Sequence, residues 1–512
     1  MDSQNTSKIS RDEKKLTQKL VAFDSFIENA GLDPKSYQRE GVEWILGNET
    51  HSNPTMGVRG GLVADEMGLG KTILMLGIII ANWKTKGTII LVPPALLDQW
   101  DTEIQRLFGH EAVVYHGRNV KCVKKMLEKN ADIPILITTY GIALSRKDGD
   151  PLFDKTWGRM ICDEAHHMRN EKKLFLKIKK IKSDIKWMVT GTPIQNKTKD
   201  LLALCNIIGL CDAMEKNPGN TKKIILQHSL RRTKKQIGIK LPPVNYHIIN
   251  VPWLSEEERE FAADIHAQLA FPNVTKRNVN SVMSFLGGHG PLPWLTRSRQ
   301  ACIFPHLLQK NIQILIDEGV VSEDADVKHI KTTSKITAVV KKLIERKKNN
   351  RRKLVFSHYH GEIDILSSLL KKFGITCSII DGRQSNNEKK YTTKKVLSKD
   401  HYNSVCTKWN SNSFVYDLVA KFMAPDVCIC QIQTACEGLN LQHFQEIYFT
   451  SPWWNPALED QAVARAHRIG QNQKVDVFRF ASENFGGESK TLDQYCLQVQ
   501  HIKRSIADNF GF

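Results

Sequence analysis

The sequence predicts an α/β protein made of two lobes, each a parallel β-sheet flanked by helices. Short apolar runs alternate with charged, helix-compatible segments, and this alternation occurs in two separate series along the chain. The runs of the first series are residues 88–92, 134–140, 159–165 and 187–193. Those of the second series are residues 353–359, 377–382, 427–433, 446–452 and 474–480. With 512 residues, the chain has room for two such lobes and for further segments.

The character of the chain changes between the two series, and this suggests four parts. These are an N-terminal extension at 1–33, a first lobe at 34–255, a helical section at 256–333 and a second lobe at 334–512. The helical section opens with Ser255 and, three residues later, Glu258, the pattern of a helix capping box. An insertion in the second lobe, at about 390–412, is rich in Lys, Ser, Asn and Thr.

The charge of the chain points to a polyanionic partner. Its formal net charge is +19, with 73 lysines and arginines against 54 aspartates and glutamates. Such an excess of positive charge favours nucleic acid. Basic residues concentrate in three clusters, at 172–182, 222–240 and 341–353. Each cluster is compatible with a solvated helix face, a DNA contact or a nuclear-import signal.

The cysteines and the N-terminus argue against a secreted or membrane protein. The 11 cysteines are an odd number without paired spacing, so we interpret them as reduced core residues. The N-terminal segment is polar and charged and lacks the apolar stretch of a secretory signal. The longest apolar run, residues 73–81, is too short for a bilayer, which takes about 20 residues. We therefore expect an intracellular protein, and a DNA substrate would place it in the nucleus.

Glycines and a lysine near residue 70 indicate a phosphate-binding loop. Residues 68–72, Gly-Leu-Gly-Lys-Thr, open an apolar stretch that suits a helix. Glycines let backbone N–H groups approach phosphate oxygens, and a helix N-terminus offers more of them. Lys71 can reach the β- and γ-phosphates, and Thr72 can bind Mg²⁺. Because Asp65 replaces the first glycine of the strict pattern, this segment alone leaves open a phosphate site or an ordinary helix start.

A pair of carboxylates follows a strand-like run farther along the chain. Asp163 and Glu164 end the apolar run that begins at residue 159, and His166 follows them. One carboxylate at a strand end can bind Mg²⁺ while the next activates water. Two surface carboxylates beyond a buried strand would look the same, but the phosphate loop upstream favours catalysis. Gln38 precedes both motifs, and its amide can hydrogen-bond two edges of adenine, although such a glutamine is more often a surface residue.

These motifs, in this order, resemble the Swi/Snf-type ATPases of helicase superfamily two. The similar segments of the first lobe are YQREGVEWIL (37–46), ADEMGLGKT (64–72), LVPPALLDQW (91–100), ITTYG (137–141), DEAH (163–166), VTGTPIQNK (189–197) and LRRTKKQIGIKLPP (230–243). Those that follow are TRSRQACIFP (296–305), SKI (334–336), KLVFSHYHGEIDIL (353–366), DGRQS (381–385), EGLNL (437–441) and SPWWNPALEDQAVARAHRIGQ (451–471). Asp65 is usual in this family, so it is no objection. The resemblance covers most of the chain and implies two RecA-like lobes with helical insertions between them.

The resemblance also implies ATP and Mg²⁺ as cofactors and a role for each matching residue. Nucleotide binding falls to Gln38, Asp65, Glu66, Met67, Gly68, Leu69, Gly70, Lys71, Thr72 and Gln461. Catalysis falls to Lys71, Glu164, Arg465 and Arg468, and the metal to Thr72 and Asp163. Coupling of the nucleotide to DNA falls to His166, Thr190, Gly191, Thr192 and Gly438. The expected activity is therefore ATP-dependent translocation on double-stranded DNA.

The segment 451–471 would supply the second half of the active site, and it contains the least certain assignments. Arg465 and Arg468 are spaced i, i+3, so a helix would present both on one face, where they would act as arginine fingers. Trp453 and Trp454 would either anchor the turn before this helix or contact DNA. One departure from the family lies upstream, where Ala435 and Cys436 replace two usual glycines and forbid the backbone conformations that glycine allows.

Several alternatives remain open at the level of sequence. A strand-separating DNA or RNA helicase shares the DEAH motif, and a regulator or scaffold without turnover would fit the change at 435–436. We find no segment resembling a bromodomain, chromodomain, RING or SANT module. Such a bare core resembles the viral branch of the family, of the baculovirus global-transactivator kind, and suggests transcription regulation in a host nucleus. Nucleosomes or the transcription machinery are possible partners.

Overall fold

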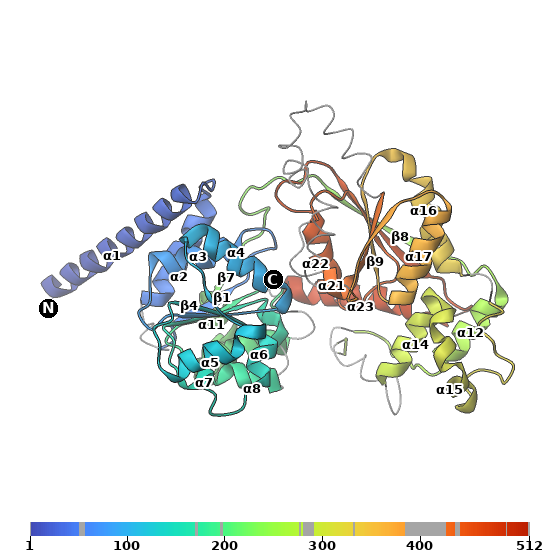
Figure 1. The fold of residues 1–512 in the computed structure, drawn as a ribbon, viewed down its shortest axis with the longest axis horizontal. Helices are drawn as coiled ribbons and strands as arrows, with labels where there is room; N and C mark the ends of the chain where they lie inside the picture. Colours follow the sequence, from blue (N-terminus) through green and yellow to red (C-terminus); the bar gives the residue numbers. More distant parts are fainter. Residues whose placement is uncertain are drawn as a thin grey trace. The chain divides into compact units, whose positions relative to one another are not determined.

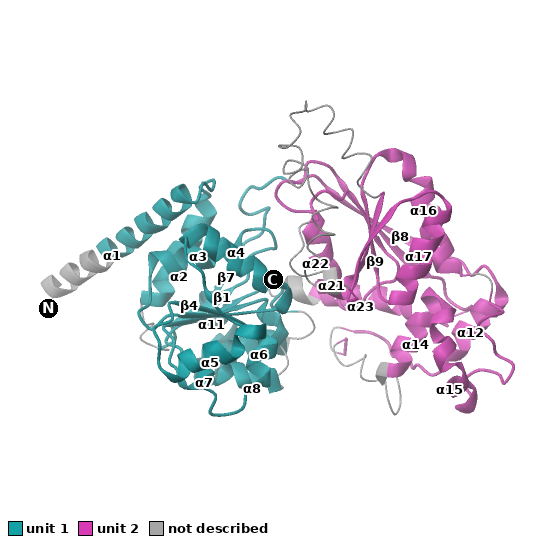
Figure 2. Ribbon diagram, viewed as in Figure 1, with its two compact units in different colours: residues 1–240, 512 teal, residues 241–511 magenta. Residues whose placement is uncertain are grey.

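The computed structural model describes most of the chain and divides it into two compact units. The described residues are 2–50, 57–168, 173–194, 198–275, 278–279, 291–330, 333–383, 426–435, 441–487 and 489–509. The first unit comprises residues 1–240 together with residue 512, and the second comprises residues 241–511 (Figure 2). None of the helices in the described residues is long and apolar enough to cross a membrane.

The first unit is built on a seven-stranded sheet in which every strand pair is parallel (Figure 1). The strand order is β3-β4-β2-β5-β6-β1-β7. The strands are β1 (Gly60–Val63), β2 (Thr88–Val92), β3 (Val113–Tyr115), β4 (Ile135–Thr139), β5 (Arg159–Asp163), β6 (Lys186–Val189) and β7 (Ser229–Leu230). Every residue of β1, β2, β4 and β5 is buried, which explains why these strands read as continuous apolar runs.

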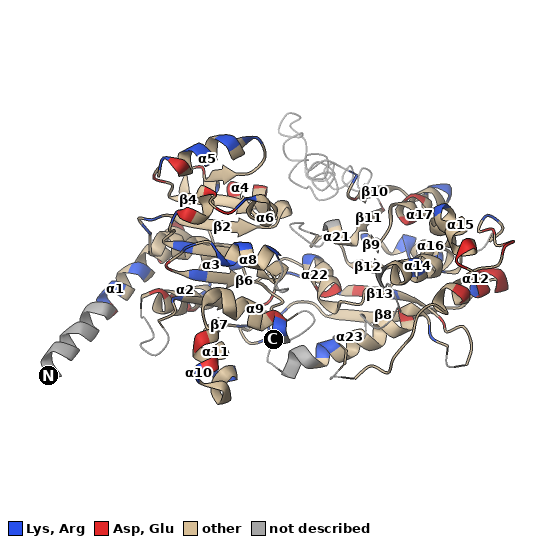
Figure 3. Cartoon of the chain, turned by 90° about the horizontal axis from the view of Figure 1, so that it is seen from below, with Lys and Arg blue, Asp and Glu red and all other residues tan. Residues whose placement is uncertain are grey.

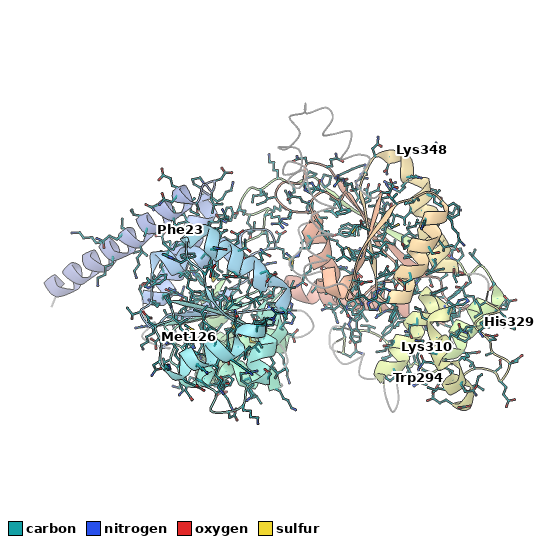
Figure 4. The ribbon with its side chains drawn as sticks, viewed as in Figure 1. Phe23, Met126, Trp294, Lys310, His329 and Lys348 are labelled. Atoms are coloured by element: carbon teal, nitrogen blue, oxygen red, sulfur yellow. The ribbon has the colours of Figure 1, made fainter. Side chains whose placement is uncertain are left out.

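Helices cover the sheet of the first unit, and the N-terminal helix belongs to this packing. The helices are α1 (Asp2–Asn29), α2 (Ser36–Thr50), α3 (Lys71–Ala81), α4 (Leu97–Phe108), α5 (Val120–Glu128), α6 (Tyr140–Ser145), α7 (Pro151–Asp154), α8 (Lys173–Lys179), α9 (Thr198–Ile208), α10 (Cys211–Lys216) and α11 (Thr221–Gln227). Phe23 of α1, labelled in Figure 4, packs so closely on α3 that a Cβ at Gly77 would lie 2.5 Å from its ring. The segment predicted as an extension thus ends in the core of the first unit.

A buried ion pair ties β5 to its neighbours at the end remote from Asp163. The carboxylate of Glu49, on α2, accepts hydrogen bonds from Arg159 Nε and Nη2, both at 2.6 Å. The same carboxylate accepts the indole N–H of Trp187 at 2.9 Å. Neither partner of the ion pair has any solvent-exposed side chain surface. Removing one partner would leave an uncompensated charge in the core, so this network strongly restricts how β5 and β6 pack.

The second unit has a six-stranded parallel sheet with the order β10-β11-β9-β12-β13-β8. The strands are β8 (Val244–Val251), β9 (Lys353–Ser357), β10 (Cys377–Ile380), β11 (Val427–Gln431), β12 (Glu446–Phe449) and β13 (Val475–Ser482). β8 pairs with β13 along its whole length, from Val244 opposite Val475 to Val251 opposite Ser482. The chain therefore leaves the first unit after Lys240, which differs from the predicted boundary at 255.

Helices of the second unit include those of the predicted helical section. They are α12 (Glu256–His266), α14 (Pro291–Ile303), α15 (Ile312–Asp317), α16 (Ser334–Glu345), α17 (His360–Lys372), α21 (Ile432–Ala435), α22 (Pro456–Ala466) and α23 (Leu492–Asn509). α12, α14 and α15 share a core cluster. Trp294 of α14 is labelled in Figure 4, and the Arg297 guanidinium lies 4.6 Å from the centre of its ring. The predicted insertion at 390–412 lies outside the described residues.

Only half of the predicted capping box forms. The Ser255 hydroxyl accepts the backbone N–H of Glu258 at 3.2 Å, as expected for an N-cap. The Glu258 carboxylate does not turn back to the cap. It is fully buried and instead accepts the backbone N–H of Ser334, at 2.9 and 3.0 Å. Glu258 therefore ties α12 to the start of α16, and burial raises its pKa.

Candidate nucleotide site

The predicted nucleotide motifs of the first unit come together because their strands are neighbours. β5, β6 and β1 are consecutive and parallel in the sheet, so their carboxyl ends lie at one edge. The loop after β1 contains residues 64–70, the loop after β5 begins at Glu164, and the loop after β6 begins at Thr190. Ligand sites of parallel α/β sheets form at this edge.

The loop after β1 has the backbone of a phosphate cradle. Gly68 and Gly70 adopt φ values of 89° and 79°, in the left-handed region that favours glycine. A Cβ at Gly70 would lie only 2.5 Å from Nε2 of Gln38. Lys71 is the first residue of α3, and its Nζ donates to the carbonyl oxygen of Asp65 at 2.9 Å. The N-terminus of an 11-residue helix thus faces the loop, as anion binding requires.

The side chain of Gln38, a residue of α2, lies against this loop, as expected for a residue near the nucleotide. Its side chain is 8% exposed, and Nε2 donates to the carbonyl oxygen of Leu69 at 3.3 Å. The hydroxyl of Tyr37 donates to the same oxygen at 3.4 Å. The two side chains therefore fix the loop backbone just before Gly70. Recognition of adenine by Gln38 stays a prediction.

The acidic residues of the loop bind a basic segment of the same unit. Both carboxylate oxygens of Asp65 accept hydrogen bonds from the Arg232 guanidinium, at 3.1 and 2.5 Å, and Asp65 is 1% exposed. Glu66 forms an ion pair with Lys234 at 2.9 Å. Although burial raises the pKa of Glu66, the hydrogen bonds from Lys234 hold it below its usual range. The side chains of Asp65 and Glu66 thus support the loop rather than offer charge to a phosphate.

The loop after β6 packs directly against the phosphate loop. A Cβ at Gly191 would lie 2.8 Å from Cγ of Met67 and 3.3 Å from Nζ of Lys71. A side chain at this position would displace the lysine, so the close approach requires glycine. This contact places the predicted coupling residue Gly191 beside the predicted phosphate-binding Lys71.

Asp163 is held by three groups. Its Oδ2 accepts the indole N–H of Trp100 at 2.8 Å, and its Oδ1 accepts the backbone N–H of Glu164 at 2.9 Å. The Tyr140 hydroxyl donates to its backbone oxygen at 2.6 Å. Burial, reinforced by the charge of Glu164, raises the pKa of Asp163 to about 6. A nearby cation would stabilise the charged form of a buried carboxylate beside a second one. The carboxylate of Asp163 and the hydroxyl of Thr72 are oxygen ligands of the kind that Mg²⁺ prefers.

Glu164 has a strained backbone and a histidine partner. Its φ is 48°, which is uncommon for a residue other than glycine and occurs most often at functional sites. Nδ1 of His166 lies 3.3 Å from Oε2 of Glu164 and 3.1 Å from the hydroxyl of Thr190. The same hydroxyl accepts the backbone N–H of Thr192 at 3.2 Å. His166, Thr190 and Thr192 thus form a chain from the predicted base to the loop after β6.

In the second unit, the helix that was predicted to present both arginines ends before the second one. α22 begins after Asn455, whose side chain accepts the backbone N–H of Ala457 at 3.3 Å, and it ends at Ala466. Arg465 is in the last turn, on the same face as Gln461, but Arg468 lies beyond the helix. The prediction of one shared helix face is therefore wrong for Arg468. The chain leaves the helix at His467, whose ψ of 78° is not helical and whose Nε2 lies 2.7 Å from the carbonyl oxygen of Pro242.

The positive charge of Arg465 nevertheless affects Arg468. Arg465 and Arg468 are each partly buried. Burial lowers the pKa of Arg468, and the positive charge of Arg465 lowers it further. Among the described residues, no carboxylate forms an ion pair with Arg468. A partly buried arginine beside a second positive charge, as Arg468 is, would be stabilised by a nearby anion.

The two tryptophans before α22 pack inside the second unit. Trp453 stacks on His358 at 5.1 Å, and the Arg299 guanidinium lies 4.5 Å over the Trp453 ring. Trp454 packs beside α23 and lies 6.0 Å from Nζ of Lys503. These contacts support the interpretation of both rings as anchors of the turn.

A buried glutamate on α22 completes the anchoring of this turn. The carboxylate of Glu459 accepts the backbone N–H of Trp453 at 2.7 Å and Nε of Arg479 at 2.6 Å. Glu459 has no exposed surface. It therefore ties the tryptophan turn, α22 and β13 together.

Two predicted features of the second unit cannot be placed. Gly438 and Cys436 lie outside the described residues, and Ala435 ends α21.

The sequence interpretation, in turn, missed Trp100, Tyr140 and Arg232 as parts of the site. Each of the three residues lies inside a segment that resembles the family. That location was the one sign in the sequence that they could belong to the site.

Comparisons with known proteins agree with these motifs. A family model described as SNF2-related domain matches residues 37–307, just over half of the chain. An uncharacterized ATP-dependent helicase of Mycoplasma genitalium is 27% identical over 98% of this chain and 45% of its own length. An ISWI chromatin-remodeling complex ATPase of Saccharomyces cerevisiae is 27% identical over 95% of this chain and 42% of its own. The chain thus spans less than half the length of these two relatives.

One solved structure is also similar. It is the Sulfolobus solfataricus SWI2/SNF2 ATPase core in complex with dsDNA, with 22% identity and coverage of 93% of this chain and 92% of that one. Its TM-score of 0.38 is too low to support an argument about this protein.

Proposed function

We propose, since this chain belongs to the SNF2-related domain family, that it is a DNA-dependent ATP hydrolase that moves along double-stranded DNA. The single observation that carries the proposal is the edge of the first sheet. There Lys71, the carboxylates of Asp163 and Glu164, and the loop of Gly191 meet on three neighbouring strands. This is the set of groups that phosphoryl transfer needs: a cradle, a metal ligand and a group that orients water.

Each residue of the first unit has a defined part in the proposed reaction. Backbone N–H groups of residues 68–72 bind the phosphates, and Lys71 leaves the Asp65 carbonyl to neutralise their charge. Thr72 and Asp163 would hold Mg²⁺, which when bound would neutralise further phosphate charge. Glu164 orients the attacking water and accepts its proton. His166 holds Glu164 in place and connects it, through Thr190, to the loop after β6.

The second unit contributes positive charge to the same reaction. We assign Arg465 and Arg468 to stabilisation of the charge that develops on the transferred phosphate, with Gln461 beside them. The partial burial of both side chains supports this assignment, and so does the charge of Arg465, which lowers the pKa of Arg468, because an anion would favour the charged form of Arg468. Because the cradle and the arginines come from different units, turnover would require the units to act together. This requirement is how hydrolysis would drive stepping along DNA.

Charge supports duplex DNA as the partner. The net charge of +19 favours a polyanion. Lysine and arginine colour much of α5 and α8 in Figure 3, whereas α12 begins with three glutamates. Contacts made by such surfaces would go to phosphates and would not depend on base sequence. Binding should therefore weaken steeply with salt.

The decisive experiment measures ATP turnover with four nucleic acids. Purified protein is titrated with duplex DNA, single-stranded DNA, RNA and nucleosomes, and phosphate release is followed at saturating ATP. Strong stimulation by duplex DNA without strand displacement supports the proposal. Preference for single strands together with robust unwinding would favour a helicase, the activity in the name of the Mycoplasma genitalium relative. No turnover with any of them would favour a non-enzymatic regulator, to which Ala435 and Cys436 point.

We also propose a biological setting, which rests on the sequence alone. The chain would act in transcription regulation of a DNA virus, as in the baculovirus global-transactivator kind, and would work in the host nucleus. Nucleosomes or proteins of the transcription machinery would be the cargo. Locating the tagged full-length chain in infected cells tests the setting, and exclusion from the nucleus would contradict it.

A further inference from the structure

A buried ion pair supports the phosphate loop. Asp65 takes the place of the first glycine of the strict phosphate-loop pattern, and its carboxylate is bound by the guanidinium of Arg232 through two parallel hydrogen bonds. Asp65 Oδ1 also accepts the backbone N–H of Arg232 at 3.0 Å. The Asp65 side chain is 1% exposed and that of Arg232 is 14% exposed. Two-pronged pairing of this kind fixes orientation as well as charge.

The chain around Arg232 continues the sheet beyond its last strand pair. β7 pairs with β1, and the backbone N–H of Ala64 then donates to Leu230 O at 2.8 Å. The backbone N–H of Glu66 donates to Arg232 O at 2.9 Å, and that of Lys234 donates to the Glu66 carboxylate at 2.8 Å. The segment 230–234 therefore runs beside the segment 64–66, with a link at almost every residue.

Arg232 also reaches the element that carries Gln38. Its guanidinium donates to the carbonyl oxygen of Tyr37 and lies 5.5 Å from the centre of the Tyr37 ring. A Cβ at Gly41 would lie 2.8 Å from Nη2 of Arg232, so α2 passes close to this group. One side chain thus joins the start of α2, the phosphate loop and the segment after β7.

The position of Arg232 in the chain connects these contacts with the segment that leaves the first unit. It lies eight residues before Lys240, where the first unit ends and the chain continues into β8 of the second sheet. On the opposite side of the junction, Nζ of Lys71 donates to the carbonyl oxygen of Asp65. Asp65 therefore stands between the lysine that would meet the phosphate and the segment that leads out of the unit.

We propose that Asp65 and Arg232 are positioning residues that transmit the state of the phosphate loop to the segment leaving the first unit. This inference rests on the proposed function. When Lys71 turns to a nucleotide phosphate, it gives up its hold on the Asp65 carbonyl. The side-chain pair of Asp65 and Arg232 then remains, together with the backbone links of residues 64–66, and a shift of the loop acts through it on residues 230–234. The pair couples nucleotide binding to movement and does not itself touch the phosphate.

The test compares movement with hydrolysis in matched variants. Asp65→Asn, Arg232→Gln and the double variant are assayed for ATP turnover and for displacement of a third strand from duplex DNA. We expect each single variant to lower the displacement per ATP hydrolysed about tenfold, and the double variant to be no worse than either, because the two residues act as one unit. Asp184→Asn serves as control, since it breaks an exposed ion pair with Lys86 in the same unit.

The outcomes separate this inference from the proposed function. A wild-type chain that neither hydrolyses ATP with duplex DNA nor moves on it contradicts the function itself. An active wild type whose variants keep the wild-type displacement per ATP, or whose two single effects add in the double variant, overturns only the coupling role. Should loss of the buried pair unfold the first unit, Arg232→Lys decides, because it keeps the charge but loses the two-pronged geometry. An unchanged ratio in that variant also overturns the proposal.

Discussion

The two halves of the proposed active site differ in how far they are organised without a ligand. In the first unit, Asp163 has hydrogen bonds to both of its carboxylate oxygens, Lys71 has a backbone acceptor, and His166 bridges Glu164 and Thr190. In the second unit, Arg468 lies past the end of α22 with Arg465 as its electrostatic neighbour. The first half is a fixed frame, whereas in the second half burial and the charge of Arg465 lower the pKa of Arg468.

This difference shows which elements fix the side-chain positions in each half. The carboxylates sit at strand ends, where a buried sheet fixes the backbone and neighbouring aromatic side chains fix the oxygens. Arg465 is fixed by a helix whose N-terminus is held by Asn455 and Glu459, but Arg468 depends on the turn after that helix. A substitution in the frame should therefore change metal or water geometry. A substitution in the arginine half should change mainly the stabilisation of the transition state.

Loss of Arg468 should have the largest effect. We expect Arg468→Ala to lower kcat for ATP by about 10³-fold, since an arginine that stabilises transferred phosphate is worth about 10³–10⁵ in rate. KM for ATP and affinity for duplex DNA should stay close to wild type. Steady-state ATPase assays and filter binding check this, with Arg297→Ala as control because Arg297 pairs with Glu318 far from α22 in sequence. A defect confined to DNA binding would rule out the assigned role.

Neutralising Glu164 should have the next largest effect. In Glu164→Gln the side chain keeps its shape but cannot accept a proton, so turnover should fall by about 10²–10⁴-fold. Nucleotide binding should survive, because Lys71 and the glycine loop are untouched. Phosphate release and binding of a fluorescent ATP analogue measure the two separately. The control is Glu103→Gln on the surface of α4, and equal activity of the two variants would remove Glu164 from the reaction.

A smaller effect is expected from the indole that orients Asp163. Trp100→Phe keeps the buried ring but deletes the 2.8 Å hydrogen bond to Oδ2. Outer partners of metal ligands typically contribute about 10–100-fold to metal affinity or activity. We expect the Mg²⁺ concentration for half-maximal turnover to rise about tenfold, with little change at saturating Mg²⁺. Trp83→Phe, at a 51% exposed position, is the matched control, and an unchanged Mg²⁺ dependence would show that the indole only fills space.

The sequence predicted the frame better than the arginine half, for a physical reason. Parallel strands buried on both faces read as continuous apolar runs, so the strands carrying Asp163 and Thr190 stood out. The partners of the loops come from other segments: Trp100 ends α4's first turn and Arg232 follows β7, and spacing in the chain does not reveal such pairings. The family resemblance placed Trp100 and Arg232 inside motifs but did not indicate which residues they contact.

Two errors at boundaries have the same origin. The i, i+3 spacing predicts a helix that presents both Arg465 and Arg468, but α22 ends at Ala466, where the next residue, His467, leaves the helical conformation and contacts Pro242. The predicted boundary at 255 assigns residues 244–251 to the first lobe, yet they form β8, whose hydrogen bonds go to β13. In both places a contact between segments distant in sequence decides the local structure.

The smallest predicted effect is a loss of folding stability at acid pH. It tests how firmly the turn before α22 is anchored in the second unit. Burial, assisted by the charge of Arg299, lowers the pKa of His358 to about 3, and burial lowers that of His266 to about 4. Because both values lie below the ordinary histidine pKa of about 6.5, the unfolded chain binds more protons below that pH, and folding stability is lost as the pH falls. For His358 alone, the loss between pH 7 and pH 5 is about 2 kcal/mol.

Urea unfolding followed by tryptophan fluorescence at pH 7, 6 and 5 measures this loss, since His358 stacks on Trp453. In His358→Gln the stability at pH 7 should change less than the pH dependence, because the variant lacks the titrating group. A stability that stays level down to pH 5 in the wild type would mean that His358 is hydrated and not held by the tryptophan turn. In that case the anchoring of α22 through Trp453 would be looser than the stacking distance of 5.1 Å indicates.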